Sequence, residues 1–258
     1  MTRLGRNSKR RQTAILKHLQ SNGRAMVDEL ADTFETTPQT IRKDLNALAE
    51  VNQIIRFHGG AALAAGTEYT RFQVRQEIAR EEKAAIASAV ASRIPNNTTI
   101  LINSGTTTAA VAMRLSHHVG LKLVTDSVYL ANKIRDFAGI EVMVPGGVVR
   151  RADGAIVGEN AVDFIRQFRV DVAVIGAAAI AYDGALLDYD LRQVYVARAI
   201  IEHAHSVVLA VDSTKFGRMA PICIGRLSQV DMLVTDRSCP AALRELCARQ
   251  DSSLVVAN

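Results

Sequence analysis

The sequence lacks the cysteine pattern of a disulfide-stabilised or metal-binding protein. Its 258 residues include three cysteines, Cys223, Cys239 and Cys247, which form neither a Cys-x-x-Cys pair nor another metal-ligand spacing. We therefore expect no metal site and no cofactor. Cysteines kept as reduced thiols also favour a cytoplasmic protein over a secreted one.

Long apolar segments are lacking as well. The uncharged run Val172–Tyr182 is far shorter than the roughly 20 residues needed to span a bilayer. The basic residues near the N-terminus are not followed by an apolar segment, so we expect no secretory signal. A chain with 48% hydrophobic and 22% charged residues is typical of a globular protein with a large core and no membrane contact.

Acidic residues are absent from the first 24 positions. The whole chain has a net charge of +5, and much of the basic excess lies in this stretch. A basic arm attracts DNA phosphates through the release of counterions, although a solvated tail would have the same composition. The segments that follow favour the DNA interpretation. The basic residues of the arm are Arg3, Arg6, Lys9, Arg10, Arg11, Lys17 and Arg24.

Residues 37–46, Thr-Pro-Gln-Thr-Ile-Arg-Lys-Asp-Leu-Asn, have the pattern of an exposed helix that reads DNA. Thr37 suits the N-cap position. Ile41, Leu45 and Leu48 form one apolar stripe, and the remaining side chains are of types that hydrogen-bond bases and phosphates. The helix residues predicted to contact DNA are Thr37, Gln39, Thr40, Arg42, Lys43 and Asn46.

Two earlier helices and a wing are predicted around this helix. Residues 10–20 and 26–34 each carry apolar side chains on one helical face, and a short break separates the second from the DNA-reading helix. Residues 53–62 combine β-branched and aromatic residues with a Gly-Gly turn, which predicts a two-stranded wing. Arg56 and His58 are expected near its tip as further DNA contacts.

The composition changes after the predicted wing, which divides the chain into two domains. Residues 1–62 form the predicted DNA-binding domain, residues 63–74 a linker and residues 75–258 a second domain. In the second domain, β-branched runs alternate with helical stretches, as in a doubly wound α/β domain with a mostly parallel sheet. The predicted strands are 99–102, 121–125, 141–144, 172–176, 207–211, 232–235 and 254–256. The predicted helices are 72–94, 107–116, 127–137, 161–168, 193–203 and 240–249.

The first predicted strand of this domain leads through a glycine- and threonine-rich segment into a helix. In doubly wound sheets, ligands bind beyond the carboxyl ends of the strands. Glycine lets an anion approach closely, and the hydroxyl and N–H groups at a helix N-terminus can bind phosphate. No lysine follows the glycine, so the segment is not a nucleoside triphosphate loop, and helix capping by the threonines is the alternative. The candidate contacts are Asn103, Ser104, Gly105, Thr106, Thr107 and Thr108.

Basic side chains follow two later strands. Lys215 is the first candidate for a cation beside the phosphate, and Arg150 or Arg151 is the second. A further acidic group could receive sugar hydroxyls or simply belong to a solvated loop, and its members are Asp183, Asp188 and Asp190.

Together these segments resemble the DeoR family of bacterial transcriptional regulators. The resemblance covers nearly the whole chain, and its motifs are 37–45, 56–61, 105–107, 145–147, 153–154 and 211–217. It implies a repressor whose sensor domain is similar in fold to ribose-5-phosphate isomerase and glucosamine-6-phosphate deaminase. Such a sensor binds a phosphorylated sugar or polyol and then releases DNA. The resemblance also adds Asp153 to the expected effector contacts.

Two positions depart from the family pattern. Asn103 stands where many members carry Asp, and Ala181-Tyr182 stands where close relatives carry an acidic residue. Both lie near the expected polyol contacts. Residues 58–63, 163–169 and 199–202 are similar to family members that respond to glycerol 3-phosphate, so this compound is the expected effector.

An enzyme fused to a DNA-binding domain is the alternative. An isomerase or deaminase needs a carboxylate or histidine near the carbonyl carbon, whereas Gly176-Ala-Ala-Ala179 offers none at the apparent equivalent position. A DNA binder without an effector would leave the glycine- and threonine-rich segment unexplained. We therefore expect a repressor with no catalytic residue that binds double-stranded operator DNA as a homodimer or homotetramer.

Overall fold

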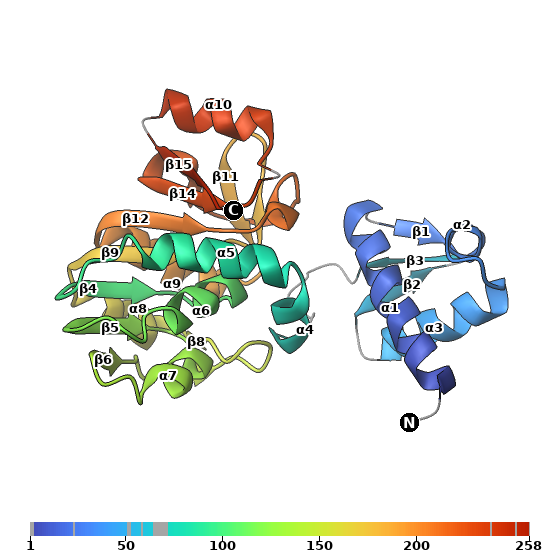
Figure 1. Ribbon diagram of the computed structural model, residues 1–258, viewed down its shortest axis with the longest axis horizontal. Helices are drawn as coiled ribbons and strands as arrows, with labels where there is room; N and C mark the ends of the chain where they lie inside the picture. Colours follow the sequence, from blue (N-terminus) through green and yellow to red (C-terminus); the bar gives the residue numbers. More distant parts are fainter. Residues whose placement is uncertain are drawn as a thin grey trace. The chain divides into compact units, whose positions relative to one another are not determined.

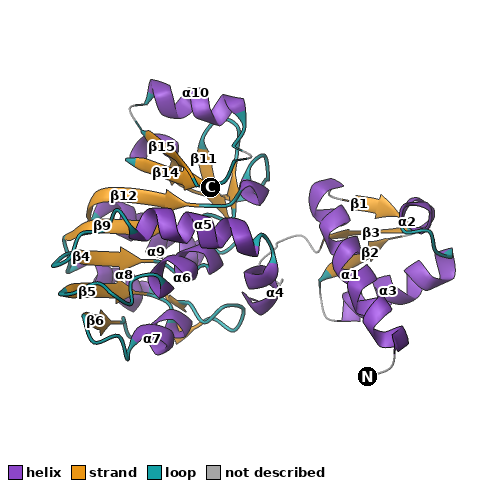
Figure 2. Cartoon of the chain, viewed as in Figure 1, coloured by secondary structure: helices purple, strands orange, loops and turns teal. Residues whose placement is uncertain are grey.

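The chain divides into two compact units, Met1–Thr70 and Arg71–Asn258, which are shown in a computed structural model in Figures 1 and 2. The predicted linker, residues 63–74, lies largely outside the described residues, and its bounds stay a prediction. The structure describes residues 3–22, 24–50, 53–57, 59–63, 72–237, 239–250 and 252–257.

The first unit is a winged helix. Its three helices are α1 (Arg3–Asn22), α2 (Val27–Thr33) and α3 (Pro38–Glu50). Its antiparallel sheet has the order β1-β3-β2, with β1 (Arg24–Met26), β2 (Ile54–Phe57) and β3 (Gly60–Leu63). The predicted helices and wing are confirmed, but α1 is longer than predicted and β1 was not predicted.

The predicted apolar stripes meet in the core of this unit. Ile41, Leu45 and Leu48 of α3 pack with Ile15 of α1 and Leu30 of α2, and all five are buried. Between α2 and α3 the chain turns within four residues, and Glu35 adopts a left-handed backbone with φ of 47°. This tight turn lets α3 keep its apolar face on the core and its other face in solvent.

The second unit is built on a seven-stranded sheet with the order β15-β14-β12-β9-β4-β5-β6. Every neighbouring pair in this sheet is parallel, so the predicted doubly wound α/β architecture is confirmed. The strands are β4 (Thr99–Ile102), β5 (Leu121–Thr125), β6 (Ile140–Met143), β9 (Val170–Ile175), β12 (Ala204–Ala210), β14 (Met232–Thr235) and β15 (Ser253–Val256).

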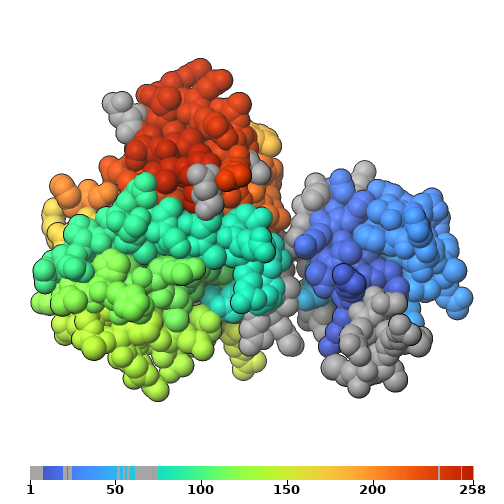
Figure 3. Space-filling view, viewed as in Figure 1, coloured from blue at the N-terminus to red at the C-terminus, as the bar shows by residue number. Residues whose placement is uncertain are grey.

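Helices cover both faces of this sheet. Successive residues of its strands are apolar and point to opposite faces, so both faces have to be buried. Leu101 and Ala173 face the core beneath α8 and α9, whereas Ile100, Ile102 and Val174 face the core beneath α5, α6 and α7. Figure 1 shows α5 and α6 in front of the sheet, and in the space-filling view of Figure 3 the teal and green segments cover this face of the unit. None of the described helices is long and apolar enough to cross a membrane. The helices are α4 (Phe72–Glu77), α5 (Arg80–Ala91), α6 (Thr106–Met113), α7 (Val128–Ile134), α8 (Glu159–Arg166), α9 (Leu191–Glu202) and α10 (Ala241–Arg249).

Three features of this unit were not predicted. The single helix expected over 72–94 is two helices, because Ala79 has a left-handed backbone with φ of 51°. A second, antiparallel sheet is formed by β10 (Ala179–Ile180), β11 (Ala185–Asp188) and β13 (Ile222–Arg226). A short hairpin joins β7 (Val148–Val149) to β8 (Ile156–Val157).

Candidate functional site

The outer face of α3 carries the side chains predicted to contact DNA. Thr37 caps the helix, since its Oγ1 accepts the N–H of Thr40 at 3.2 Å. Arg42 and Lys43 are exposed, and Thr40 is half-buried. Gln39 and Asn46 are exposed on the same helix. Thr37 and Thr40 thus serve the start of the helix, whereas Gln39, Arg42, Lys43 and Asn46 present hydrogen-bonding groups to solvent.

The wing strand β2 contributes to the same surface. The guanidinium group of Arg56 donates a hydrogen bond to Oδ1 of Asn46, so a wing side chain lies against a side chain of α3. His58, the second predicted wing contact, lies outside the described residues and stays a prediction.

Asp44 of α3 has a structural role that was not predicted. Its carboxylate is 2% exposed and points inward to α1, where Ser8 Oγ donates to it at 2.7 Å and Gln12 Nε2 at 3.1 Å. Arg11 completes the contact with an ion pair to the same carboxylate. These contacts fix the orientation of α3 relative to α1. The sequence does indicate this role, because position 44 lies on the apolar face of the helix beside Ile41 and Leu45, where an aspartate needs a buried partner.

In the second unit, the predicted anion loop lies between the end of β4 and the start of α6. The carbonyl oxygen of the Asn103 side chain accepts the N–H of Gly176, which follows β9, at 3.1 Å. A Cβ added to Gly176 would lie 3.7 Å from Thr108 Cγ2 and 3.9 Å from the carbonyl oxygen of Ala210 in β12. The carboxyl ends of β4, β9 and β12 therefore lie next to one another.

The six loop residues divide into buried and accessible ones. Asn103, Thr107 and Thr108 are buried, and the Thr108 hydroxyl donates to the carbonyl oxygens of Asn103 and Gly105 at 2.8 and 3.1 Å. These contacts hold the shape of the loop. Ser104, Gly105 and Thr106 are partly accessible. The buried Ser104 Oγ has no hydrogen-bond partner within the described part of the chain, so the loop contains an unsatisfied polar group.

Lys215 lies beyond the end of β12, on the short helix η2 (Ser213–Lys215). Its ammonium group forms no hydrogen bond or ion pair with any residue that the structure describes. Burial lowers its pKa to about 8; the charge of Asp212 opposes this shift, and the charges of Arg218, Arg75 and Lys83 reinforce it. A partly buried cation without a partner is well suited to an anionic ligand.

Lys83 of α5 is a second buried cation, which was not predicted as a site residue. It is 4% exposed, and its Nζ donates to the backbone carbonyl oxygens of Arg75 and Ile78. Burial lowers its pKa, although the charge of Asp212 acts in the opposite direction. Lys83 and Thr106 line the same groove of about 480 Å³, so this lysine lies close to the first turn of α6. Its burial could have been predicted, because position 83 lies on the apolar stripe of the predicted helix.

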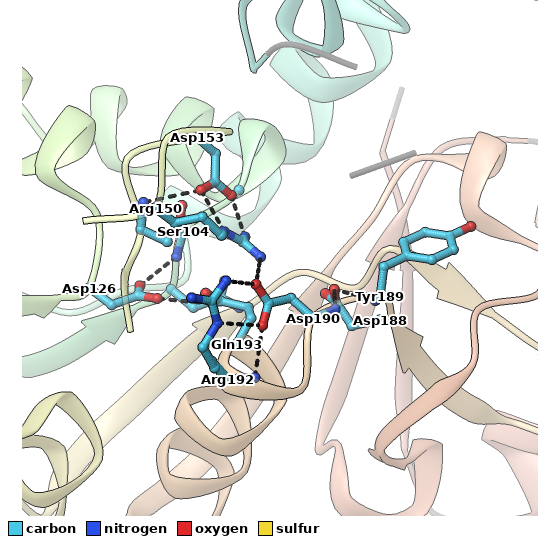
Figure 4. Close-up of polar contacts among 12 residues, drawn as sticks. Ser104, Asp126, Arg150, Asp153, Asp188, Tyr189, Asp190, Arg192 and Gln193 are labelled. Atoms are coloured by element: carbon cyan, nitrogen blue, oxygen red, sulfur yellow. Dashed lines mark hydrogen bonds and ion pairs between the residues drawn. The ribbon is translucent and has the colours of Figure 1, made fainter. Parts of the chain in front are cut away.

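Arg150 and Asp153 lie together, bound to each other (Figure 4). The guanidinium group of Arg150 donates to Asp153 at 2.6 and 3.0 Å and pairs with Asp190 at 3.3 Å. Burial acts to lower the pKa of Arg150, but the hydrogen bond and the charges of these carboxylates raise it overall. Arg75 of α4 lies 3.6 Å from the same Asp153 carboxylate. Asp190 also caps α9 through the N–H of Arg192. Of the predicted groups, Arg150, Asp153 and Asp190 therefore form one ion-pair network at this end of the sheet. Asp183 lies elsewhere, 3.9 Å from Arg226.

Asp126, at the end of β5, links the anion loop to α9 (Figure 4). Its fully buried carboxylate accepts the N–H of Ser104 at 2.6 Å and the amide of Gln193 at 2.9 Å. Burial raises its pKa to about 6, although both hydrogen bonds act to lower it. Asp126 was not predicted as a site residue, since a lone aspartate after a strand does not belong to a recognisable motif.

Family models match both units of the chain. The DeoR-like helix-turn-helix domain matches residues 11–67, and the DeoR C-terminal sensor domain matches residues 78–237. The glycerol-3-phosphate regulon repressor of Escherichia coli (strain K12) is 41% identical over 92% of this chain and 94% of its own length. The HTH-type transcriptional repressor CsqR of the same organism is 38% identical over 95% of this chain and 94% of its own length.

Among solved structures, a ribose-5-phosphate isomerase in complex with phospho-erythronic acid matches 53% of this chain and 54% of its own, with a TM-score of 0.41 and 18% identity. The two family models together match both the helix-turn-helix and most of the α/β unit, and full-length repressors match nearly the whole chain. This settles the choice between a regulator and a fused enzyme. The chain belongs to the DeoR family of DNA-binding transcriptional regulators.

Proposed function

We propose that this regulator represses transcription until glycerol 3-phosphate binds its sensor unit. In the absence of the effector, α3 enters the major groove of operator DNA and the wing contacts the adjacent backbone. The residues that bind DNA in this proposal are Thr37, Gln39, Thr40, Arg42, Lys43, Asn46, Arg56 and His58. The protein acts in the cytoplasm, where the DNA is.

The observation that carries the effector proposal is the ammonium group of Lys215, which forms no hydrogen bond or ion pair with a described residue. It is close enough to Lys83 for the two charges to interact, and Lys83 lines a groove together with Thr106 at the start of α6. Phosphate brings about two negative charges at neutral pH, and the N–H groups of Gly105 and Thr106 supply donors at the positive end of α6. Ser104 Oγ gains a partner in the same step. Asn103, Thr107 and Thr108 hold the loop, and Arg150 and Asp153 order the neighbouring segment.

Glycerol 3-phosphate is preferred over other phosphate esters because of the regulon named in the 41% identical relative. CsqR is nearly as similar, at 38% identity, so the identity of the effector has to be tested directly. Binding favours one conformation only by its differential affinity for that conformation, so the effector must bind the DNA-free state more tightly.

Thermal unfolding tests the effector. Glycerol 3-phosphate, ribose 5-phosphate, glycerol and inorganic phosphate are each added to the purified protein. At a concentration of about 100 times the dissociation constant, a ligand specific for the folded state stabilises it by about 2.7 kcal/mol. A rise in Tm with glycerol 3-phosphate alone is expected. A rise with ribose 5-phosphate instead would replace the effector, and no rise with any phosphate would refute the sensor proposal.

A DNA experiment tests the other half of the proposal. A duplex selected by this protein from a random library is the probe. We expect glycerol 3-phosphate to release the wild-type protein from this duplex, and the variant Thr106→Val to stay bound at the same effector concentration. Loss of DNA binding by folded Thr106→Val would contradict the separation of the two sites.

A further inference from the structure

A groove lies on the outer surface of the sensor unit, between α8 and α9. Its volume is about 710 Å³. Both helices contribute acidic and basic side chains to it, and its charged lining consists of Glu159, Asp163, Arg166, Arg192, Arg198 and Glu202. The effector site does not use any of these residues.

The charges of this groove suit a second copy of the same surface. Three acidic and three basic residues give the lining no net charge, so it would not attract a polyanion such as DNA or a strongly charged partner. A surface with both signs can pair with itself around a two-fold axis, because each acidic residue can then meet a basic residue of the other copy.

Two exposed apolar side chains flank the charges on α9. Leu191 is 47% exposed and Tyr195 is 49% exposed, and Tyr195 lines the groove. Arg198 is held in place because it donates to the backbone carbonyl oxygens of Cys223 and Ile224, at 2.6 and 3.1 Å. Tyrosine and arginine are enriched at protein interfaces, and a side chain fixed in advance loses little entropy on association.

The inner side of α9 is tied to the effector loop. Gln193 reaches Ser104 through Asp126, and Asp190 at the start of α9 pairs with Arg150 (Figure 4). A change in the loop can therefore reach the outer face of α9 through two direct contacts. A winged-helix repressor also needs two copies to bind two half-sites of an operator.

We infer that the outer face of α8 and α9 is the surface through which two copies of this chain associate. The association itself does not depend on which effector binds. Its regulation through Asp126 and Arg150 rests on the function proposed above.

Sedimentation velocity of the full-length protein over a range of concentrations tests the inference. The variant Tyr195→Asp places a charge on this face, and we expect it to raise the dimer dissociation constant at least about tenfold. Tyr195→Phe should associate like the wild type. Val119→Asp is the matched control, because Val119 is 60% exposed on the loop before β5 and should leave association unchanged.

A second variant tests the charges independently of the aromatic side chain. In Glu159→Lys/Asp163→Lys the lining becomes strongly basic, so two copies should repel each other at low salt and reassociate in part at high salt. Circular dichroism checks that each variant is folded. A wild type that is monomeric at all concentrations, or folded variants that associate as tightly as the wild type, would overturn the inference.

The thermal response to glycerol 3-phosphate separates this result from the proposed function. If Tyr195→Asp is monomeric and still stabilised by the effector, both proposals stand. If the wild type associates through this face but shows no response to any phosphate, the effector proposal fails alone.

Discussion

Replacing Lys215 with methionine should make the protein more stable and unable to sense its effector. Methionine has a similar length and no charge. In the free protein, burial lowers the pKa of the Lys215 ammonium from 10.5 to about 8. One pKa unit corresponds to about 1.4 kcal/mol, so keeping this group charged in the folded state costs up to about 3.5 kcal/mol. Because Lys215 is only partly buried, solvent reduces this cost, and we expect a gain of about 1–2 kcal/mol for Lys215→Met.

The pH dependence follows from the direction of the pKa shift. Below pH 8 the lysine is charged in both folded and unfolded states, so the full cost of burial is present. Between pH 8 and 10.5 the folded state releases its proton first, and the wild type gains stability relative to the variant. The advantage of Lys215→Met should therefore be largest at pH 7 and nearly gone at about pH 10.

Scanning calorimetry with and without glycerol 3-phosphate measures both effects. For a unit of this size we expect Lys215→Met to raise Tm by about 3–6 °C at pH 7. The loss of one charge-assisted hydrogen bond should weaken effector binding by about 1.5–3 kcal/mol, roughly ten- to hundredfold. Lys122→Met is the control, because Lys122 is exposed on β5 and its charge is therefore solvated in the folded state. A destabilised Lys215→Met that binds the effector normally would refute the reasoning.

Three further predictions concern the other residues described here. Arg42→Ala should weaken binding to the selected duplex by about 1–3 kcal/mol if Arg42 contacts a base, with the effector response unchanged; electrophoretic mobility shifts measure the first and thermal unfolding the second. Asp44→Ala should destabilise the winged helix by about 2–4 kcal/mol, because Arg11 loses its buried partner. Chemical denaturation monitored by circular dichroism measures this change, and an unchanged midpoint would contradict the prediction. Asp126 has its pKa raised to about 6 in the folded state, so the wild type should gain stability relative to Asp126→Asn as the pH falls from about 7 to 4.5; parallel denaturation curves of the two proteins across that range would argue against a buried carboxylate.

The elements with strong periodicity could be predicted from the sequence alone. The strands 99–102, 121–125 and 232–235 have the predicted bounds, since each is a short, mostly apolar run that polar residues follow. The helix-turn-helix was predictable for a similar reason, because Ile41, Leu45 and Leu48 leave a single possible buried face.

The features that were missed depend on tertiary contacts. The break at Ala79 has no glycine or proline to mark it, and the two-residue strand β10 is too short to show alternation. The pairing of Arg150 with Asp153 and Asp190 also could not be read from spacing, because the third partner comes from a distant segment. For the same reason Arg150 was predicted as a ligand contact without its carboxylate partners.

The two faces of α3 give this repressor freedom to change its target. The residues that hold the helix in place, Ile41, Asp44, Leu45 and Leu48, all point inward. Gln39, Arg42, Lys43 and Asn46 point outward and contribute little to folding. A mutation on the outer face can therefore alter the preferred DNA sequence while the stability of the domain stays close to its original value. Duplicated genes of this kind can diverge in operator choice by single steps, without a compensating change in the core, and the same four positions are the natural place to randomise when a new operator is wanted.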